Sequence, residues 1–380
     1  MADISGTCDE QFAPLQEEFA RQLDSGAELG ASLAVTIAGK RVVDLWGGWS
    51  DVNRTVPWGR DTITCVWSLS KTITAIAALV LADRGEIDLY APVARYWPEF
   101  AANGKERVEV RHLLSHTSGV SGWEPPFRHQ DVYDWPASTA RLAAQAPWWE
   151  PGTASAYHDI SYGHLVGEVV RRVTGRSLGT FVAEDIAGPL GADFLIGMPA
   201  QDLARVSDVT FPGYVLETAP EHPTSVDAKT FVPFDMALTA SSEWRQAEIP
   251  AANGHGNARS LARINSLISN GGQVDDIRLL SPETIELIFD EQSDGIDLAC
   301  GIPLRFGIGF GLPQITTFPY IPAGRRCFWL GWGGSIVVND LDRALTLAYV
   351  MNQMGEGSPG GMGTDRTKAY TRTALSCVLD

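Results

Sequence analysis

Residues 65–84 read Cys-Val-Trp-Ser-Leu-Ser-Lys-Thr-Ile-Thr-Ala-Ile-Ala-Ala-Leu-Val-Leu-Ala-Asp-Arg, and this segment guides the interpretation of the whole chain. Apolar residues lie on almost all sides of the predicted helix, which is typical of a buried helix. Ser68 and Lys71 are three residues apart, so they share one helix face in its first turn. Burial disfavours the charged form of a lysine, and a neutral amine is a general base. We therefore predict that Lys71 activates the hydroxyl of Ser68 as a nucleophile.

The alternative is structural, because a serine near the start of a helix is often only a cap. Ser-x-x-Lys is also a loose pattern with low specificity. The distribution of lysines favours the catalytic interpretation. Only Lys71 has a serine three residues before it, and only Lys71 is followed by a long apolar run; the five lysines are at positions 40, 71, 105, 229 and 368.

Length and composition limit the classes of function. The 380 residues suffice for one large core or two domains, and 44% hydrophobic with 20% charged residues is ordinary for a globular protein. The formal net charge of −17 argues against a nucleic-acid partner and against binding to an anionic membrane surface. Neither a nucleic-acid nor a membrane partner is therefore expected.

The cysteines and the N-terminus indicate the compartment. Five scattered cysteines without a Cys-x-x-Cys pair suggest reduced thiols in a cytoplasmic protein, with neither a zinc site nor a disulfide framework; they are at positions 8, 65, 300, 327 and 377. The first ten residues have no basic region followed by an apolar run, so no secretion signal is predicted. No apolar run is long enough to span a bilayer. We expect no metal and no cofactor.

The order of predicted elements gives the fold class. A helix and a hairpin are followed by a long region of helices, and then by antiparallel strands and a final helix. This order predicts an α/β protein of the α+β type, in which both chain ends build one antiparallel sheet flanked by helices. We assign residues 1–85 and 235–380 to this α/β domain and residues 86–234 to an inserted, mainly helical domain, with the active site at their interface.

The predicted elements come from hydrophobic periodicity and from turn residues. The helices are expected at 9–24, 65–84, 110–119, 137–146, 161–174, 257–269 and 364–378, with a short one opened by Ser281-Pro282. The strands are expected at 30–38, 41–49, 307–311, 327–330, 335–339 and 344–351. Between residues 86 and about 200 no strand is predicted.

Two further stretches supply groups that a Ser–Lys pair needs. Tyr157 precedes the 161–174 helix, and a tyrosine that faces a lysine is able to carry a proton. Glycines surround Trp332 and let the backbone approach a ligand closely. A backbone N–H of this glycine-rich segment, together with the N–H of Ser68, is then expected to stabilise the oxyanion that forms during the reaction. Taken alone, each stretch has a structural alternative. Tyr157 would be a buried aromatic residue, and the glycines would form a β-bulge.

Other hydrolase designs are not expected. The match to Gly-x-Ser-x-Gly at residues 175–179 follows the helix predicted at 161–174 and not a strand, so it lacks the strand–turn–helix context of an α/β-hydrolase. No His-Glu-x-x-His occurs, which argues against a zinc protease. His112, His116 and His164 lie on or beside predicted helices and are assigned structural roles.

Together, Ser68-Leu-Ser-Lys71, Pro151-Gly-Thr with Tyr157-His-Asp159, and Trp332-Gly-Gly334 resemble the serine β-lactamase/penicillin-binding-protein-like superfamily. Segments 110–120 and 253–262 are similar to the same family. The resemblance implies a β-lactamase/transpeptidase-like fold. It also implies that Ser68 is the nucleophile, Lys71 the base and Tyr157 the proton shuttle, with the backbone N–H groups of Ser68 and Ser335 as the oxyanion hole.

Departures from the family pattern indicate the substrate. Trp332, Gly333 and Gly334 stand where class C β-lactamases have Lys-Thr-Gly, so the cation for a β-lactam carboxylate is missing. Tyr157-His158-Asp159 replaces Tyr-x-Asn. The pattern is similar to family VIII carboxylesterases, which implies short-chain neutral esters. The predicted substrate contacts are Trp332, Gly333, Gly334, His158 and Asp159, with an apolar pocket built from some of Trp123, Trp135, Trp148, Trp149 and Trp332.

Several alternatives within the superfamily stay open at this point. The chain is also compatible with an amidase, a D-peptidase, a β-lactamase or an acyltransferase. A non-turnover module that binds an acyl group and senses penicillin is a further alternative, and the intact Ser68, Lys71 and Tyr157 weigh against it.

Overall fold

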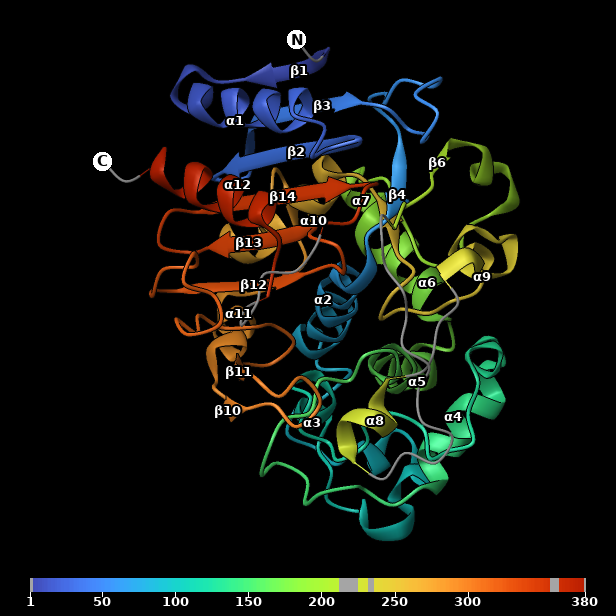
Figure 1. Cartoon of the computed structure of the whole chain (residues 1–380). Helices are drawn as coiled ribbons and strands as arrows, with labels where there is room; N and C mark the ends of the chain where they lie inside the picture. Colours follow the sequence, from blue (N-terminus) through green and yellow to red (C-terminus); the bar gives the residue numbers. More distant parts are fainter. Residues whose placement is uncertain (1–2, 212–224, 232–235, 356–361, 379–380) are drawn as a thin grey trace.

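The computed structural model describes residues 3–211, 225–231, 236–355 and 362–378. Figure 1 shows a layer of strands in which the N-terminal (blue) and C-terminal (red) segments lie side by side, above a region of helices from the middle of the chain. The protein therefore has the mixed helix and antiparallel-sheet architecture that the sequence predicts. The predicted boundary between residues 234 and 235 lies outside the described residues.

The main sheet has six strands in the order β1-β3-β2-β14-β13-β12, and all its pairs are antiparallel. In its centre, Leu33 lies between Leu45 and Tyr349. All residues of β14 are buried, as expected for a strand covered on both faces. The strands are β1 (Ile4–Cys8), β2 (Gly30–Ile37), β3 (Lys40–Gly48), β12 (Arg326–Leu330), β13 (Ile336–Asp340) and β14 (Leu345–Met351).

Helices cover both faces of this sheet. On one face, α1 (Ala13–Asp24) packs against α12 (Asp365–Ser376). On the other face, α10 (Ala258–Ser269) packs against β2, β13 and β14 and also contacts α2 (Ser70–Asp83). Residues 70–81 of α2 are all buried, so α2 is the central helix that the sequence predicts.

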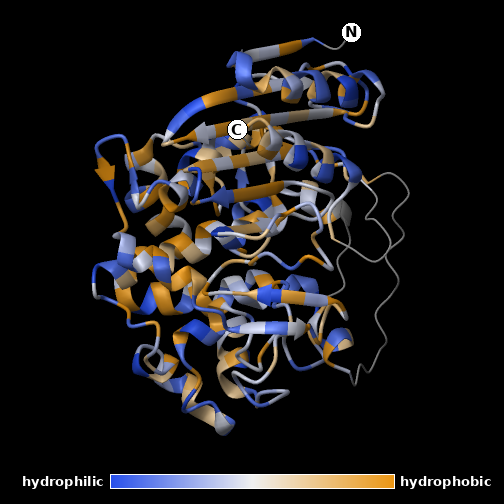
Figure 2. Cartoon of the chain, turned by 90° about the vertical axis from the view of Figure 1, so that its left-hand side faces the viewer, coloured by the Kyte–Doolittle hydropathy of each residue, from blue (hydrophilic) through white to orange (hydrophobic). Residues whose placement is uncertain are grey.

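The helical region packs below the sheet. Its longest helix, α5 (Ser161–Thr174), has the predicted bounds and contacts α2, α3 and α4. One continuous hydrophobic core joins this region to the sheet, and Figure 2 shows hydrophobic residues in both. The other α-helices are α3 (Val110–Leu114), α4 (Trp135–Ala144), α6 (Leu178–Phe181), α7 (Gly188–Leu190), α8 (Val226–Thr230), α9 (Ser242–Gln246) and α11 (Pro282–Glu286). Within the described residues, no helix is both long and apolar enough to cross a lipid bilayer.

A small second sheet corrects two predictions. Its strands, in the order β5-β7-β4-β6, are β5 (Phe194–Leu195), β7 (His255–Gly256), β4 (Ile63–Cys65) and β6 (Val206–Ser207). Cys65 therefore ends a strand and does not begin a helix. β5 and β6 lie in the segment assigned to the helical domain, but they pair with β7 and β4. Strands of two residues carry no detectable periodicity, which is why the sequence does not reveal them.

The strand predicted at 307–311 is also wrong. The strand there is β11 (Pro303–Phe306), which pairs with β10 (Ser293–Ile296), and the chain then turns at Gly309 with φ of 84°. Only Gly311 forms an isolated bridge, to Phe328. The glycine-rich run does not form a strand because Gly309 adopts a turn conformation. β1, β8 (Gln273–Val274), β9 (Ile277–Arg278) and β10 were not predicted.

Candidate active site

Ser68 lies in a 3₁₀ turn, Trp67–Leu69, between β4 and α2, and not inside the α-helix. Trp67 has a φ of 53°, which is unfavourable for a non-glycine residue. Two hydrogen bonds hold this turn, from the Ser70 hydroxyl to the Trp67 carbonyl (2.5 Å) and from the Gly254 N–H to the Ser70 hydroxyl (2.9 Å). The turn leaves Ser68 partly exposed while its neighbours are buried.

The structure brings Lys71 to Ser68 as the spacing predicts. The Lys71 ammonium nitrogen lies 3.0 Å from Ser68 Oγ and 3.0 Å from the Ala251 carbonyl oxygen. Lys71 is only 2% exposed, and burial lowers its pKa to about 7, although the nearby Asp159 acts in the opposite direction. A substantial fraction of Lys71 is therefore a neutral amine at neutral pH.

Tyr157 completes the cluster around Ser68. The Lys71 nitrogen lies 4.7 Å from the centre of the Tyr157 ring, and the Tyr157 hydroxyl is hydrogen-bonded to Ser68. Trp329 Nε1 donates to the same hydroxyl at 3.1 Å. Burial, with a smaller contribution from Asp159, raises the pKa of Tyr157 well above its usual value. Tyr157 therefore keeps its proton at neutral pH, and Lys71 is the better base of the two.

The loop between β12 and β13 contains Ser335 and is tightly hydrogen-bonded. The Gly331 N–H donates to the Ser335 carbonyl at 2.8 Å, and the Gly334 N–H donates to the Gly331 carbonyl at 3.1 Å. The Gly333 carbonyl accepts a hydrogen bond from Gly355 at 2.9 Å. Gly333 and Gly334 both have positive φ values, 85° and 124°. Hydrogen bonds within the loop and one from Gly355 therefore fix the backbone conformation around Ser335.

This loop packs directly on the Ser68 turn. The Trp332 ring lies 5.3 Å from the Trp67 ring in an edge-to-face arrangement, and Trp332 is partly exposed. A Cβ atom at Gly331 would collide with the Val66 carbonyl, so the two backbones are in close approach. The structure thus brings together the Ser68 turn and the predicted oxyanion loop.

The two residues after Tyr157 have different surroundings. Asp159 is partly exposed and interacts with Lys71, and burial raises the pKa of its carboxyl group. His158 is fully buried. Its Nε2 is 2.7 Å from the Ser118 hydroxyl and its Nδ1 is 2.6 Å from the Ala156 carbonyl. Because both ring nitrogens are engaged inside the protein, His158 is unsuited to the predicted role of substrate contact.

The predicted tryptophans lie in different surroundings. Trp123 is buried in the helical region and packs on His164 at a ring distance of 5.2 Å. Trp135 stacks on the same histidine at 4.7 Å but is partly exposed. Trp148 hydrogen-bonds to Glu124 by its indole N–H. Trp149 packs edge-on against His158, and Trp332 packs on Trp67 of the Ser68 turn.

Three supporting groups were not predicted. The Trp329 indole holds the Tyr157 hydroxyl, and the Ala251 carbonyl holds Lys71. The fully buried Asp297 accepts three backbone hydrogen bonds through Oδ1, from Tyr157 (3.0 Å), Ala299 (3.0 Å) and Cys300 (2.9 Å). No local signal marks these groups; Asp297, for example, is followed by Leu-Ala-Cys before the next glycine.

Among residues 3–211, 225–231, 236–355 and 362–378, no three His, Cys, Asp or Glu side chains are grouped so that they would hold a metal ion. The absence of a metal in the reaction stays a prediction.

Comparisons with known proteins find relatives over nearly the whole chain. The model of the β-lactamase family matches residues 15–371. The chain is 35% identical to "Esterase/beta-lactamase LipL" of Mycobacterium tuberculosis, over 92% of this chain and 83% of that protein. A crystal structure of a family VIII carboxylesterase is 38% identical with a TM-score of 0.91, over 99% of this chain and 100% of that chain. A penicillin-binding protein homolog from Caulobacter crescentus is 38% identical with a TM-score of 0.90, again over 99% and 100%.

Proposed function

Because the chain belongs to the β-lactamase family, we propose that it hydrolyses short-chain neutral esters through a covalent acyl intermediate on Ser68. The chain is a serine hydrolase of the carboxylesterase class with the β-lactamase/transpeptidase-like fold. The observation that carries the proposal is the contact between Ser68 and a buried Lys71 whose pKa is close to neutral.

The first half of the proposed reaction forms the acyl-enzyme. Lys71 takes the hydroxyl proton of Ser68, and Ser68 Oγ attacks the ester carbonyl. The backbone N–H groups of Ser68 and Ser335 stabilise the oxyanion of the tetrahedral intermediate. When the intermediate collapses, the proton passes from Lys71 through the Tyr157 hydroxyl to the leaving alkoxide. The bond to the alcohol breaks, and the acyl group remains on Ser68.

The second half releases the acid. A water molecule takes the place of the alcohol and loses its proton to the Lys71–Tyr157 pair as it attacks the acyl carbon. The Ser68 oxygen leaves and regains a proton from the same pair. Lys71 is then neutral again, so acylation and deacylation balance in protons. Wild-type turnover of a series of p-nitrophenyl esters, compared with an amino-acid amide, tests this assignment.

The residues around Ser68 support an uncharged substrate. Trp332 offers an indole where a β-lactam carboxylate would need a cation, and Asp159 adds a carboxyl group beside Lys71. An unpaired substrate carboxylate at this place would cost on the order of 1–3 kcal/mol. An ester also needs less protonation of its leaving group than an amide does, because an alkoxide leaves more readily than an amide nitrogen. These features favour neutral esters over β-lactams and amides.

The substitution Trp332→Lys is expected to move specificity toward β-lactams. Wild-type kcat/KM should be higher for p-nitrophenyl acetate or butyrate than for a chromogenic cephalosporin. The new ammonium group should lower the ester-to-cephalosporin ratio by about tenfold or more, since one charge-assisted hydrogen bond contributes roughly 1.5–3 kcal/mol. Trp332→Met removes the indole without adding a cation and serves as the control. A wild type with the higher kcat/KM for the cephalosporin would replace the esterase proposal by a β-lactamase.

The substitution Asp159→Asn is expected to shift the pH dependence. Asp159 raises the pKa of Lys71, so its neutralisation should lower that pKa below about 7. Lys71 would then stay neutral to lower pH, and the acidic limb of kcat/KM should move to lower pH. The measurement is a pH–rate profile of wild type and variant with a p-nitrophenyl ester. A limb that stays in place, or moves to higher pH, would show that Asp159 does not act on the base.

A further inference from the structure

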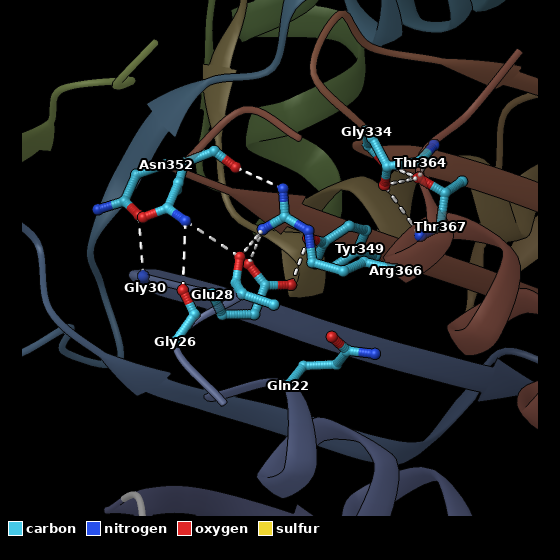
Figure 3. A network of polar contacts seen from close by, with 12 residues as sticks. Gln22, Gly26, Glu28, Gly30, Gly334, Tyr349, Asn352, Thr364, Arg366 and Thr367 are labelled. Atoms are coloured by element: carbon cyan, nitrogen blue, oxygen red, sulfur yellow. Dashed lines mark hydrogen bonds and ion pairs between the residues drawn. The ribbon is translucent and has the colours of Figure 1, made fainter. Parts of the chain in front are cut away.

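The start of the C-terminal helix contacts the oxyanion loop at Gly334. The hydroxyl of Thr367, in the first turn of α12, donates to the Gly334 carbonyl at 2.5 Å. Figure 3 shows Gly334 beside Thr364 and Thr367. A Cβ atom at Gly334 would lie 2.7 Å from Thr364 Oγ1, and the φ angle of Gly334 is 124°. Position 334 therefore requires glycine, because only glycine lets the helix end approach this closely.

The Gly334 carbonyl and the Ser335 N–H belong to one peptide group. This peptide is trans and planar, so its C=O and N–H point in opposite directions. A hydrogen bond that fixes the direction of the oxygen therefore fixes the direction of the N–H. A donor on the carbonyl also polarises the amide and strengthens its N–H as a donor. The Thr367 hydroxyl thus acts on the Ser335 N–H without touching it.

The hydroxyl proton of Thr367 is used in the hydrogen bond to the Gly334 carbonyl. Thr364 and Thr367 form a reciprocal cap, in which each backbone N–H donates to the hydroxyl of the other residue at 3.2 Å. The two hydroxyl oxygens lie 2.9 Å apart. Since the Thr367 proton goes to Gly334, Thr364 donates in this pair. Both threonines are almost completely buried, so water does not replace these partners readily.

A buried ion pair holds the same helix turn in place. The Arg366 guanidinium bonds to Glu28 Oε2 (2.5 Å), to the Gln353 carbonyl (2.6 Å) and to the Ala27 carbonyl (2.8 Å). Arg366 is 5% exposed and Glu28 is 2% exposed. Such a pair fixes geometry because each charge has several specific partners. The first turn of α12 is therefore anchored to the segments just before β2 and just after β14, two strands that pair with each other, while it contacts Gly334 (Figure 3).

We propose that Thr367 is a positioning residue of the oxyanion hole, which orients and polarises the Gly334–Ser335 peptide from the side remote from Ser68. This inference rests on the proposed function, because it assumes that the Ser335 N–H stabilises the tetrahedral intermediate. A residue that only capped the helix would affect the stability of the fold. A residue that aims an oxyanion donor affects the transition state more than substrate binding.

The test is the substitution Thr367→Val, which keeps the shape and removes the donor. We expect kcat for p-nitrophenyl acetate to fall about tenfold or more with KM within about twofold, since removal of a complete oxyanion donor costs about 10²–10³ in kcat. Affinity for a boronic acid, which forms a tetrahedral adduct, should fall in parallel. Thr367→Ser keeps the hydroxyl and should restore most of kcat. Thr371→Val is the matched control, because Thr371 lies one turn later and donates only to the helix carbonyl of Thr367.

The outcomes separate this inference from the proposed function. If Thr367→Val is folded and keeps kcat within twofold of wild type, the positioning role is wrong. If Thr371→Val loses as much kcat as Thr367→Val, the effect comes from the helix and the inference also fails. If Thr367→Val does not fold, the ratio of kcat between Thr367→Ser and Thr367→Ala decides, and a ratio near one refutes the role. Failure of the proposed function itself would appear as a wild type that a fluorophosphonate does not label on Ser68.

Discussion

Ser68→Ala is expected to reduce kcat for p-nitrophenyl acetate by at least about 10³-fold, since loss of a nucleophile of this kind removes nearly all covalent catalysis. The fold should be retained. Ser68 is partly exposed at the site, and the turn that carries it is held by Ser70 and Gly254 rather than by its own side chain. Circular dichroism and the thermal unfolding midpoint of the variant should therefore match those of wild type.

Covalent labelling identifies the reactive oxygen. A fluorophosphonate should add to Ser68, and the adduct should be absent in Ser68→Ala. Ser68 and Ser70 fall in the same tryptic peptide, between Arg60 and Lys71, so fragment ions must assign the modified residue. The Ser70 hydroxyl is fully buried and engaged, and Ser70→Ala should still be labelled on Ser68. An adduct on any other serine would remove the proposed mechanism.

Lys71→Arg is expected to be nearly inactive, with a loss of kcat of about 10²-fold or more. A guanidinium group stays protonated at all working pH values and does not accept the Ser68 proton. Arginine retains the positive charge and much of the length of the lysine side chain. The variant therefore separates the role of Lys71 as a base from the effect of a positive charge at this position. Lys40→Arg, at an exposed position next to the turn between β2 and β3, is the control for the chemical change itself.

The wild-type pH profile provides the second measurement on Lys71. The neutral amine is the active form, and its pKa is about 7, so kcat/KM should fall about tenfold for each pH unit below that value. Activity above one tenth of wild type in Lys71→Arg would require another base. His158 is then a poor candidate, because burial lowers its pKa to about 3 and both of its ring nitrogens are engaged.

The sequence predicts the elements whose signal is local and long. The 161–174 helix has the predicted bounds. The predicted hairpin is present as β2–β3, but its turn lies at Ala38 and Gly39 and not at residues 39–40; their positive φ values of 49° and 74° suit a tight hairpin turn. The Ser68–Lys71 contact follows from three-residue spacing. The contact forms although Ser68 lies in a 3₁₀ turn and not in the α-helix, because residues three apart also lie on the same side of a 3₁₀ turn.

The parts that were missed depend on long-range contacts. Nothing local distinguishes His158, which is buried, from Asp159, which is partly exposed, although they are neighbours. The Trp329 indole and the Ala251 carbonyl reach the site only because their segments fold back to Ser68. Prediction of such contacts needs the register of strands that are far apart in sequence, and one sequence does not contain that information.

The pairing of β2 with β14 has a consequence for how the protein is made. Ala31 pairs with Met351, so β2 acquires this neighbour only after the chain has been synthesised beyond residue 351. Contacts between such distant residues form slowly, because the loop between them must first be closed. On the ribosome, the apolar edge of β2 stays without this partner throughout elongation. A nascent chain that stops before residue 345 would therefore be a target for chaperones and proteases rather than a smaller esterase.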